Sequence, residues 1–128
     1  LFIYRFMAKN VKGDEKIMKK IIITFISLLM LTGCSSDAKI TKINGSKAKE
    51  LIKSEAVLID VRTKEEYKEK HIEGAINIPH TEISKVEYDK DTKIIVYCRS
   101  GNRSNMAAEE LLSLGYKNIY DLGSMDNY

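Results

Sequence analysis

Short apolar runs alternate with longer amphipathic segments through most of this sequence, and no other feature narrows the possible folds as much. The apolar runs suit buried strands and occupy residues 40–43, 56–61, 75–78, 93–97 and 118–122. Helical spacing or a helix-start signal marks residues 46–54, 63–70, 81–86 and 104–114. Strands that alternate with helices favour right-handed crossovers and a parallel sheet. We therefore predict an α/β fold with a central, mostly parallel sheet flanked by helices, and KIIVY as the central strand.

Two of the helices carry more detailed expectations. Thr63 and Glu66 fit a capping box, in which each side chain bonds the backbone N–H of the other residue, so a helix should begin there. The helix over residues 104–114 should end at Gly115. Its apolar face should consist of Met106, Ala107, Leu111, Leu112 and Leu114.

The stretch MKKIIITFISLLMLTGCSS, residues 18–36, has the parts of a secretory signal. Two lysines precede the apolar run 21–31, which is shorter than the about 20 residues that span a bilayer. Small residues then precede Cys34. This order resembles the bacterial lipobox, which implies that Cys34 is lipidated and becomes the first residue of the mature protein. An ordinary cleaved signal and a short apolar helix in a cytoplasmic core are the alternatives.

The expected domain boundaries follow from this signal. Residues 1–17 precede a natural start at Met18, and we expect them to be untranslated; a genuine extension is the alternative. Residues 18–33 would be the signal peptide, 34–39 the lipidated cysteine with its tether, and 40–128 the folded domain. The lipid would hold that domain on the extracytoplasmic face of a bacterial membrane.

The charge and the cysteines limit the possible partners. The full chain has 21 basic and 18 acidic residues, whereas from Cys34 onward there are 15 basic and 16 acidic residues, a net charge of −1. The mature domain therefore has no electrostatic footprint for nucleic acid. If lipid occupies Cys34, then Cys98 is the only free thiol and no internal disulfide can form. A free thiol is a liability in an oxidising exterior, so a chain that keeps one is expected to use it.

Cys98 begins the loop CRSGNRS, directly after the predicted central strand. Only a thiolate is a useful nucleophile. Three features should favour it: free N–H groups at the start of the following helix, an anion nest in the turn, and two arginine charges. The nest residues are Ser100, Gly101 and Asn102, and the arginines are Arg99 and Arg103. The same loop would hold a sulfur oxyanion. The alternative is a buried apolar cysteine at a strand end, which is common.

The sequence resembles the rhodanese family of single-domain sulfurtransferases from about Ile43 to Leu122. The resemblance rests on segments in family order and at family spacing: LIDVR, EY, HIEGAINIP, IVYCRSGNRS and LGYKNIY. It implies a rhodanese-like three-layer α/β fold with a central, mostly parallel β-sheet flanked by helices.

The resemblance also implies a two-step transfer of sulfane sulfur. Cys98 would attack the outer sulfur of a small anionic donor such as thiosulfate, release sulfite and carry a persulfide, which cyanide or a thiol then accepts. No metal or organic cofactor is required, and we expect a monomer. The persulfide and the anion would be held by Arg99, Ser100, Gly101, Asn102, Arg103 and Ser104, with Arg103 as the closing charge.

Other polar residues have competing interpretations. Asp60 and Arg62 belong to the family's D-x-R turn. They either shape the electrostatics of the active site or are structural, with Asp60 accepting loop hydrogen bonds and Arg62 pairing with Glu66 or another acid. We favour the structural interpretation. His71 and His80 are the only histidines; we expect neither to be a general base, and without a second free cysteine they make no convincing metal site.

Other functions compete with sulfur transfer. Some would need a loop of another length after the cysteine, and others would use the same loop without catalytic turnover. Phosphatases and arsenate reductases related to this fold place arginine after five intervening residues, but Arg103 follows Cys98 after four, so we do not expect phosphatase activity. At the end of the chain, Gly123 and Ser124 replace a usual Gly-Gly turn and any helix is rudimentary, which leaves acceptor choice and loop rigidity open. A persulfide carrier, a sulfide or oxidant sensor, and a structural lipoprotein with an inactive domain remain alternatives.

Overall fold

The computed structural model describes residues 17–20 and 37–128. The chain divides into two compact units, Leu1–Ser35 and Ser36–Tyr128. In the first unit, residues 17–20 are helical. None of the helices in the described ranges has the length and hydropathy that a membrane span needs. The predictions for the signal segment and for Cys34 fall almost entirely outside the described residues.

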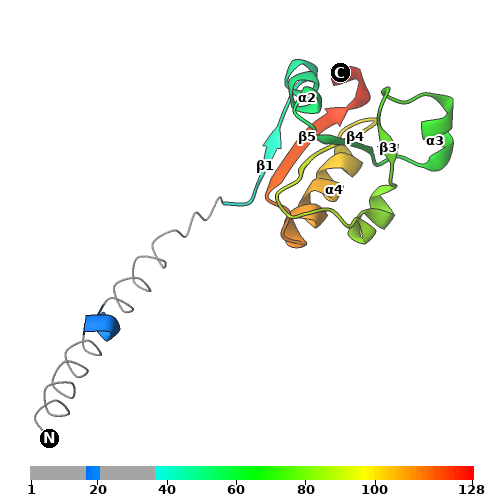
Figure 1. Cartoon of the computed structure of the whole chain (residues 1–128). Coiled ribbons are helices and arrows are strands. Elements are labelled where there is room, and N and C mark those ends of the chain that lie inside the picture. Colours follow the sequence, from blue (N-terminus) through cyan, green and yellow to red (C-terminus); the bar gives the residue numbers. More distant parts are fainter. Residues whose placement is uncertain (1–16, 21–36) are drawn as a thin grey trace, which may run out of the picture. The chain divides into compact units, whose positions relative to one another are not determined.

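The predicted strands form one parallel sheet of five strands in the order β1-β5-β4-β2-β3 (Figure 1). The strands are β1 (Lys39–Lys42), β2 (Val57–Asp60), β3 (Ile76–Asn77), β4 (Lys93–Cys98) and β5 (Asn118–Ser124). Because β4 pairs with β2 on one side and with β5 on the other, KIIVY is the central strand, as predicted. The strand expected over residues 75–78 is reduced to two residues at the edge of the sheet.

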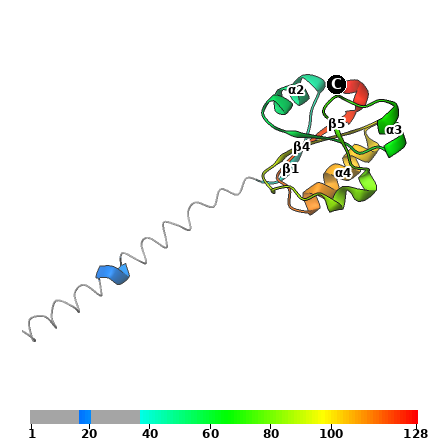
Figure 2. The same ribbon diagram turned by 45° about the vertical axis from the view of Figure 1, so that its right-hand side comes forward.

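Helices cover both faces of the sheet, so the fold has three layers (Figures 1 and 2). The helices are α2 (Gly45–Lys53), α3 (Lys64–Glu69), η1 (His80–Lys85), α4 (Asn102–Ser113) and η2 (Met125–Asn127), of which η1 and η2 are 3-10 helices. Helices α4 and η1 lie on one face and α2 lies on the other. Thr63 and Glu66 form the predicted capping box at the start of α3. Gly115, with a φ of +88°, follows α4 as predicted.

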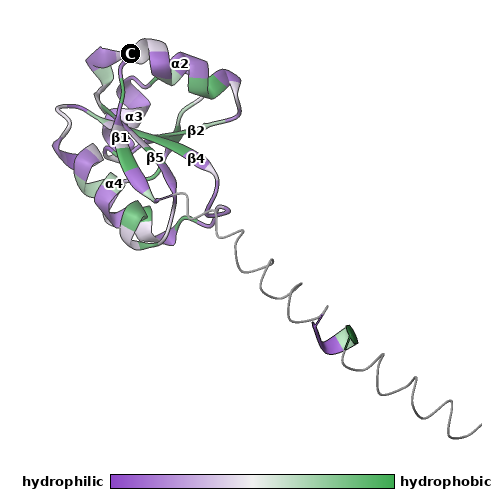
Figure 3. Ribbon diagram, turned by 90° about the vertical axis from the view of Figure 1, so that its left-hand side faces the viewer, coloured by the Kyte–Doolittle hydropathy of each residue, from purple (hydrophilic) through white to green (hydrophobic). Residues whose placement is uncertain are grey.

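Alternation along β4 sends its side chains into two hydrophobic clusters. Ile94, Val96 and Cys98 join the cluster covered by α4 and η1, whereas Ile95 and Tyr97 join the cluster covered by α2. All five side chains are fully buried, and burial of a large apolar side chain contributes about 1.5–3 kcal/mol. Figure 3 shows hydrophobic strands between helices that carry much hydrophilic colour. Cys98 therefore lies on the α4 face of the sheet.

Helix α4 differs from its prediction in two respects. It begins at Asn102, two residues early, because the left-handed conformation of Gly101 (φ +97°) ends the loop there. The prediction that Met106 belongs to the apolar face is wrong, since its side chain is 50% exposed, while Ala108 is fully buried. The buried residues of α4 are Ser104, Ala107, Ala108 and Leu111. This spacing of three and four residues turns position 106 toward solvent.

Candidate functional site

The Cys98 sulfur lies at the carboxyl end of the central strand, where the loop to α4 begins. The side chain is fully buried, and its Sγ accepts a hydrogen bond from the backbone N–H of Gly101, with an N···S distance of 2.9 Å. Ligands of open α/β sheets bind outside the carboxyl ends of the strands. The cysteine therefore lies at the carboxyl end of the parallel strands, where a site is expected, and the Gly101 N–H is directed at its sulfur.

Two glycines face each other where the loop meets β5. Gly101 and Gly123 have φ values of +97° and +74°, and a Cβ atom added to Gly101 would lie 3.6 Å from the Cα of Gly123. A register shift brings Gly123 to this place, because Tyr97 pairs with Gly123 whereas Val96 pairs with Asp121. Residues other than glycine are strained at such φ values. The end of β5 thus supports the loop from close range.

Two hydroxyl groups fasten the same loop. The Ser124 Oγ donates to the Arg99 carbonyl at 2.7 Å, and the Ser104 Oγ donates to the Gly101 carbonyl at 3.0 Å. Ser104 is fully buried at the start of α4. Ser124 was not assigned to the site from the sequence, because its bond joins residues 25 positions apart. The serine in place of a second glycine therefore helps to hold the loop.

Arg103 is held by an acid that sequence reasoning did not assign to the site. Its Nη1 and Nη2 donate to Glu66 Oε2 and Oε1 at 2.7 and 2.9 Å. The hydrogen bonds from Arg103 lower the pKa of Glu66 to about 2, and the backbone N–H of Thr63 makes the next largest contribution. The carboxylate is therefore ionised at neutral pH. The same bonds raise the pKa of Arg103. From the sequence, Glu66 belonged to the capping box and the EY segment and was a possible partner of Arg62, but it was not assigned to Arg103.

Asp60 and Arg62 form a buried network with Tyr97. Arg62 donates to both carboxylate oxygens of Asp60, at distances down to 2.6 Å, and the Tyr97 hydroxyl donates to Asp60 Oδ2 at 2.8 Å. The bond with Asp60 raises the pKa of Arg62, and burial raises the pKa of Tyr97. Arg62 therefore pairs with Asp60 and not with Glu66, whose carboxylate Arg103 occupies. This arrangement favours the structural interpretation of the D-x-R turn.

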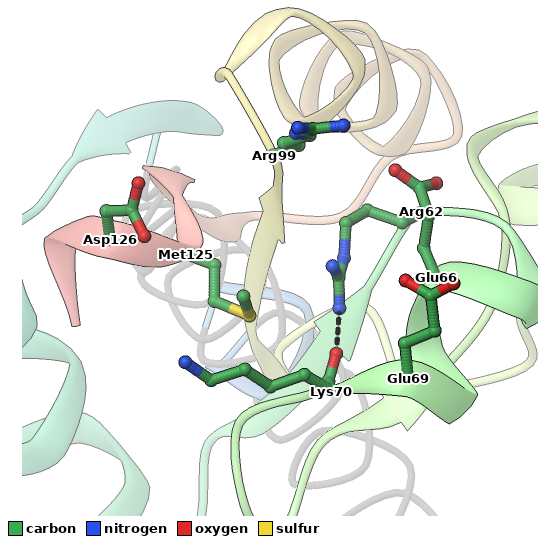
Figure 4. A pocket seen from close by; sticks show the side chains of 7 residues that line it. All are labelled: Arg62, Glu66, Glu69, Lys70, Arg99, Met125 and Asp126. Carbon is green, nitrogen blue, oxygen red and sulfur yellow. Dashed lines mark hydrogen bonds between the residues drawn. The ribbon is translucent and has the colours of Figure 1, made fainter.

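A cavity of about 370 Å³ lies between the loop, α3 and η2 (Figure 4). Its lining residues are Arg62, Glu66, Glu69, Lys70, Arg99, Met125 and Asp126. The Arg62 Nη2 donates a hydrogen bond to the Lys70 carbonyl at 2.6 Å, as well as one to Asp60. Arg99 is exposed, and within residues 37–128 its guanidinium has no ion pair. Of the two loop arginines, Arg99 is therefore the exposed one, whereas Arg103 is paired with Glu66.

The remaining predicted loop residues border solvent or a second cavity. A cavity of about 480 Å³ lies between the loop and the end of β5, and Ser100 and Gly101 line it. Asn102 is exposed at the first position of α4. Cys98 lines neither cavity.

The two histidines lie in different surroundings from Cys98. The ring of His71 stacks on Tyr67 with 3.8 Å between ring centroids, and its Nδ1 is 2.7 Å from the Tyr67 carbonyl oxygen. His80 lines a third cavity, together with Met106 and other residues of η1 and α4. In the part of the chain that the structure describes, no group of three or more potential ligands among His, Cys, Asp and Glu is placed to hold a metal ion.

Two protein-family models match the chain. Residues 45–128 match the family described as a rhodanese-like domain. Residues 18–35 match the pattern described as a prokaryotic membrane lipoprotein lipid attachment site, in the segment where the lipobox was predicted.

Individual proteins of known sequence or structure also resemble this chain. The thiosulfate sulfurtransferase PspE of Escherichia coli (strain K12) is 38% identical over 71 residues, which are 52% of this chain and 68% of PspE. The putative sulfur carrier protein YrkF of Bacillus subtilis (strain 168) is 37% identical over 67 residues, 51% of this chain but only 36% of YrkF. A solved structure titled "rhodanese with anions from E. coli" superposes with a TM-score of 0.54 at 35% identity, covering 57% of this chain and 91% of that one.

Proposed function

The chain belongs to the rhodanese-like domain family, and from that premise we propose that it is a sulfurtransferase that carries sulfane sulfur on Cys98. The similarity to a thiosulfate sulfurtransferase supports sulfur transfer of the rhodanese type. The observation that carries the proposal is the Cys98 sulfur at the carboxyl end of β4, with the Gly101 N–H 2.9 Å away. Thiosulfate is the proposed donor, and cyanide or a thiol is the proposed acceptor.

The first step loads the enzyme. The Cys98 thiolate attacks the outer sulfur of thiosulfate, a bond forms between the two sulfur atoms, and the bond to the sulfonate sulfur breaks. The electron pair of that bond leaves with sulfite, so the charge balances and the product on the protein is a persulfide anion. In the second step, the acceptor attacks the outer sulfur and releases the Cys98 thiolate. Neither step requires a metal or an organic cofactor, because each is a nucleophilic substitution at sulfur.

The loop residues have separate parts in these steps. Backbone donors, of which the Gly101 N–H is in place, stabilise negative charge on sulfur, and the α4 N-terminus adds its partial positive charge. Arg103, which both carboxylate oxygens of Glu66 hold beside the loop, contributes a fixed positive charge. Arg99 would attract the anionic donor from the 370 Å³ cavity, with Ser100, Asn102 and Ser104 completing the turn.

We test sulfur transfer by the intact mass of the full chain purified in detergent. Incubation with thiosulfate should add one sulfur atom, located on the peptide that contains Cys98. Cyanide should then remove that atom as thiocyanate and restore the starting mass. A mass that never changes, while Cys98 is still alkylated by iodoacetamide, would contradict a thiosulfate-dependent transfer.

A persulfide carrier is the second candidate, and the similarity to a putative sulfur carrier protein favours keeping it. A carrier would load Cys98 once but would turn over only with its partner. An enzyme should form thiocyanate over many cycles from thiosulfate and cyanide alone. Multiple turnovers therefore support the sulfurtransferase, and a single stoichiometric transfer supports the carrier.

We also propose the location of the domain. The lipid attachment pattern supports lipidation of Cys34 after removal of residues 18–33. The tether would then hold residues 40–128 on the extracytoplasmic face of the membrane. Cys34→Ser should move the protein from the membrane fraction to the soluble fraction of fractionated cells. Unchanged membrane retention would mean that another feature holds the chain there.

A further inference from the structure

We propose that Glu66 is a positioning residue of the sulfur-transfer site: its carboxylate holds the Arg103 guanidinium beside the Cys98 loop and affects sulfur loading only through that arginine. The inference rests on the proposed function, because it assigns a part in the loading of Cys98. It extends the proposed site beyond the Cys98 loop, because Glu66 belongs to α3. Its side chain lines the 370 Å³ cavity together with Arg99 of the loop (Figure 4).

The ion pair has the geometry of a clamp. Both carboxylate oxygens of Glu66 accept hydrogen bonds from the terminal nitrogens of Arg103, with N···O distances of 2.7 and 2.9 Å. A bidentate pair of this kind fixes the plane of the arginine as well as its distance. Within residues 37–128, both bonds of the pair use the terminal nitrogens of Arg103 and leave its Nε–H without a hydrogen bond. About a quarter of each side chain is exposed, at 26% and 24%, so water only partly screens the pair.

Glu66 is itself held in place. Its Oε2 accepts the backbone N–H of Thr63 at 2.9 Å, and its own N–H donates to the Thr63 Oγ at 3.2 Å. The capping box therefore fixes the Glu66 carboxylate at the first turn of α3 independently of Arg103. Because Glu66 stays ionised at neutral pH, it is a poor general acid or base. Its remaining chemical role is to direct the charge of Arg103.

No other acid among the described residues pairs with Arg103. The neighbouring arginine of the cavity, Arg62, is committed to Asp60 and to the Lys70 carbonyl, and Arg99 is exposed. Without Glu66, the long side chain of Arg103 would regain its rotamer freedom and its charge would no longer be placed for the transition state. Misplacement by about 1 Å can lower a rate by up to about a hundredfold.

The test is a double-mutant cycle on the rate of sulfur loading, measured by intact mass of the full chain after timed exposure to thiosulfate. Glu66→Gln should slow loading about tenfold and Arg103→Ala at least as much. The double variant should load no more slowly than Arg103→Ala alone. Glu65→Gln is the matched control, because Glu65 is an exposed acid in the same first turn of α3; it should stay within twofold of wild type.

The outcomes separate this inference from the proposed function. Wild type that loads, with Glu66→Gln loading equally fast, overturns the positioning role and leaves sulfur transfer standing. Losses that multiply in the double variant also overturn it, because Glu66 then acts independently of Arg103. A slow Glu66→Gln variant whose defect vanishes in the Arg103→Ala background supports it. Wild type that takes no sulfur from thiosulfate or polysulfide overturns both.

Discussion

Cys98→Ser is expected to abolish sulfur loading while the domain stays folded. Serine is close in size to cysteine and its hydroxyl can accept the Gly101 N–H, so the loop geometry is kept. A neutral hydroxyl is a far weaker nucleophile than a thiolate, and the loading rate should fall more than about a thousandfold. Since the side chain is fully buried in an apolar cluster, the hydroxyl should also lower stability by roughly 1–2 kcal/mol. Intact mass after thiosulfate and a urea melt measure the two effects.

The second cysteine provides the control for this experiment. Cys34→Ser keeps Cys98 and should load sulfur at the wild-type rate, whatever its effect on membrane attachment. Loading that survives in Cys98→Ser would place the sulfur elsewhere and would contradict the assignment of the nucleophile. A Cys98→Ser chain that fails to fold would be replaced by Cys98→Ala, which fits the same buried site without a polar group.

Arg62→Ala is expected to cost about 3–5 kcal/mol of unfolding free energy, a large part of the stability of a small domain. The Asp60 carboxylate is fully buried, and Arg62 supplies most of the hydrogen bonds that compensate its charge. Without the guanidinium, the donors that remain to the carboxylate within residues 37–128 are the Tyr97 hydroxyl and the backbone N–H of position 62. Equilibrium unfolding in urea at neutral pH measures the loss.

Lys64→Ala is the control for this loss, because Lys64 is an exposed cation at the start of α3 and its removal should change stability by less than about 0.5 kcal/mol. A loss below about 1 kcal/mol for Arg62→Ala would show that the network does not support the fold. If sulfur loading then fell while stability held, the active-site interpretation of the D-x-R turn would be the correct one.

Most of the candidate site was predictable because it is contiguous. The loop from Cys98 to Ser104 follows directly from the central strand, and the parallel sheet places that end where ligands bind. Alternation along KIIVYC also assigns Cys98 to the same face as Ile94 and Val96. The start of α4 was misplaced by two residues, because a glycine in the left-handed conformation is visible only in the backbone.

The sequence by itself determined the alternation of strands and helices, the capping box of α3 and the cysteine at the end of the central strand. These features depend on spacing within a few residues, so they can be read along the chain. Only the tertiary structure decided which acid binds which arginine. Arg103 and Glu66 are 37 positions apart, and Arg62 had more than one acid within reach. The choice depends on how α3 and α4 are placed by the register of the sheet, and no local pattern encodes that distance.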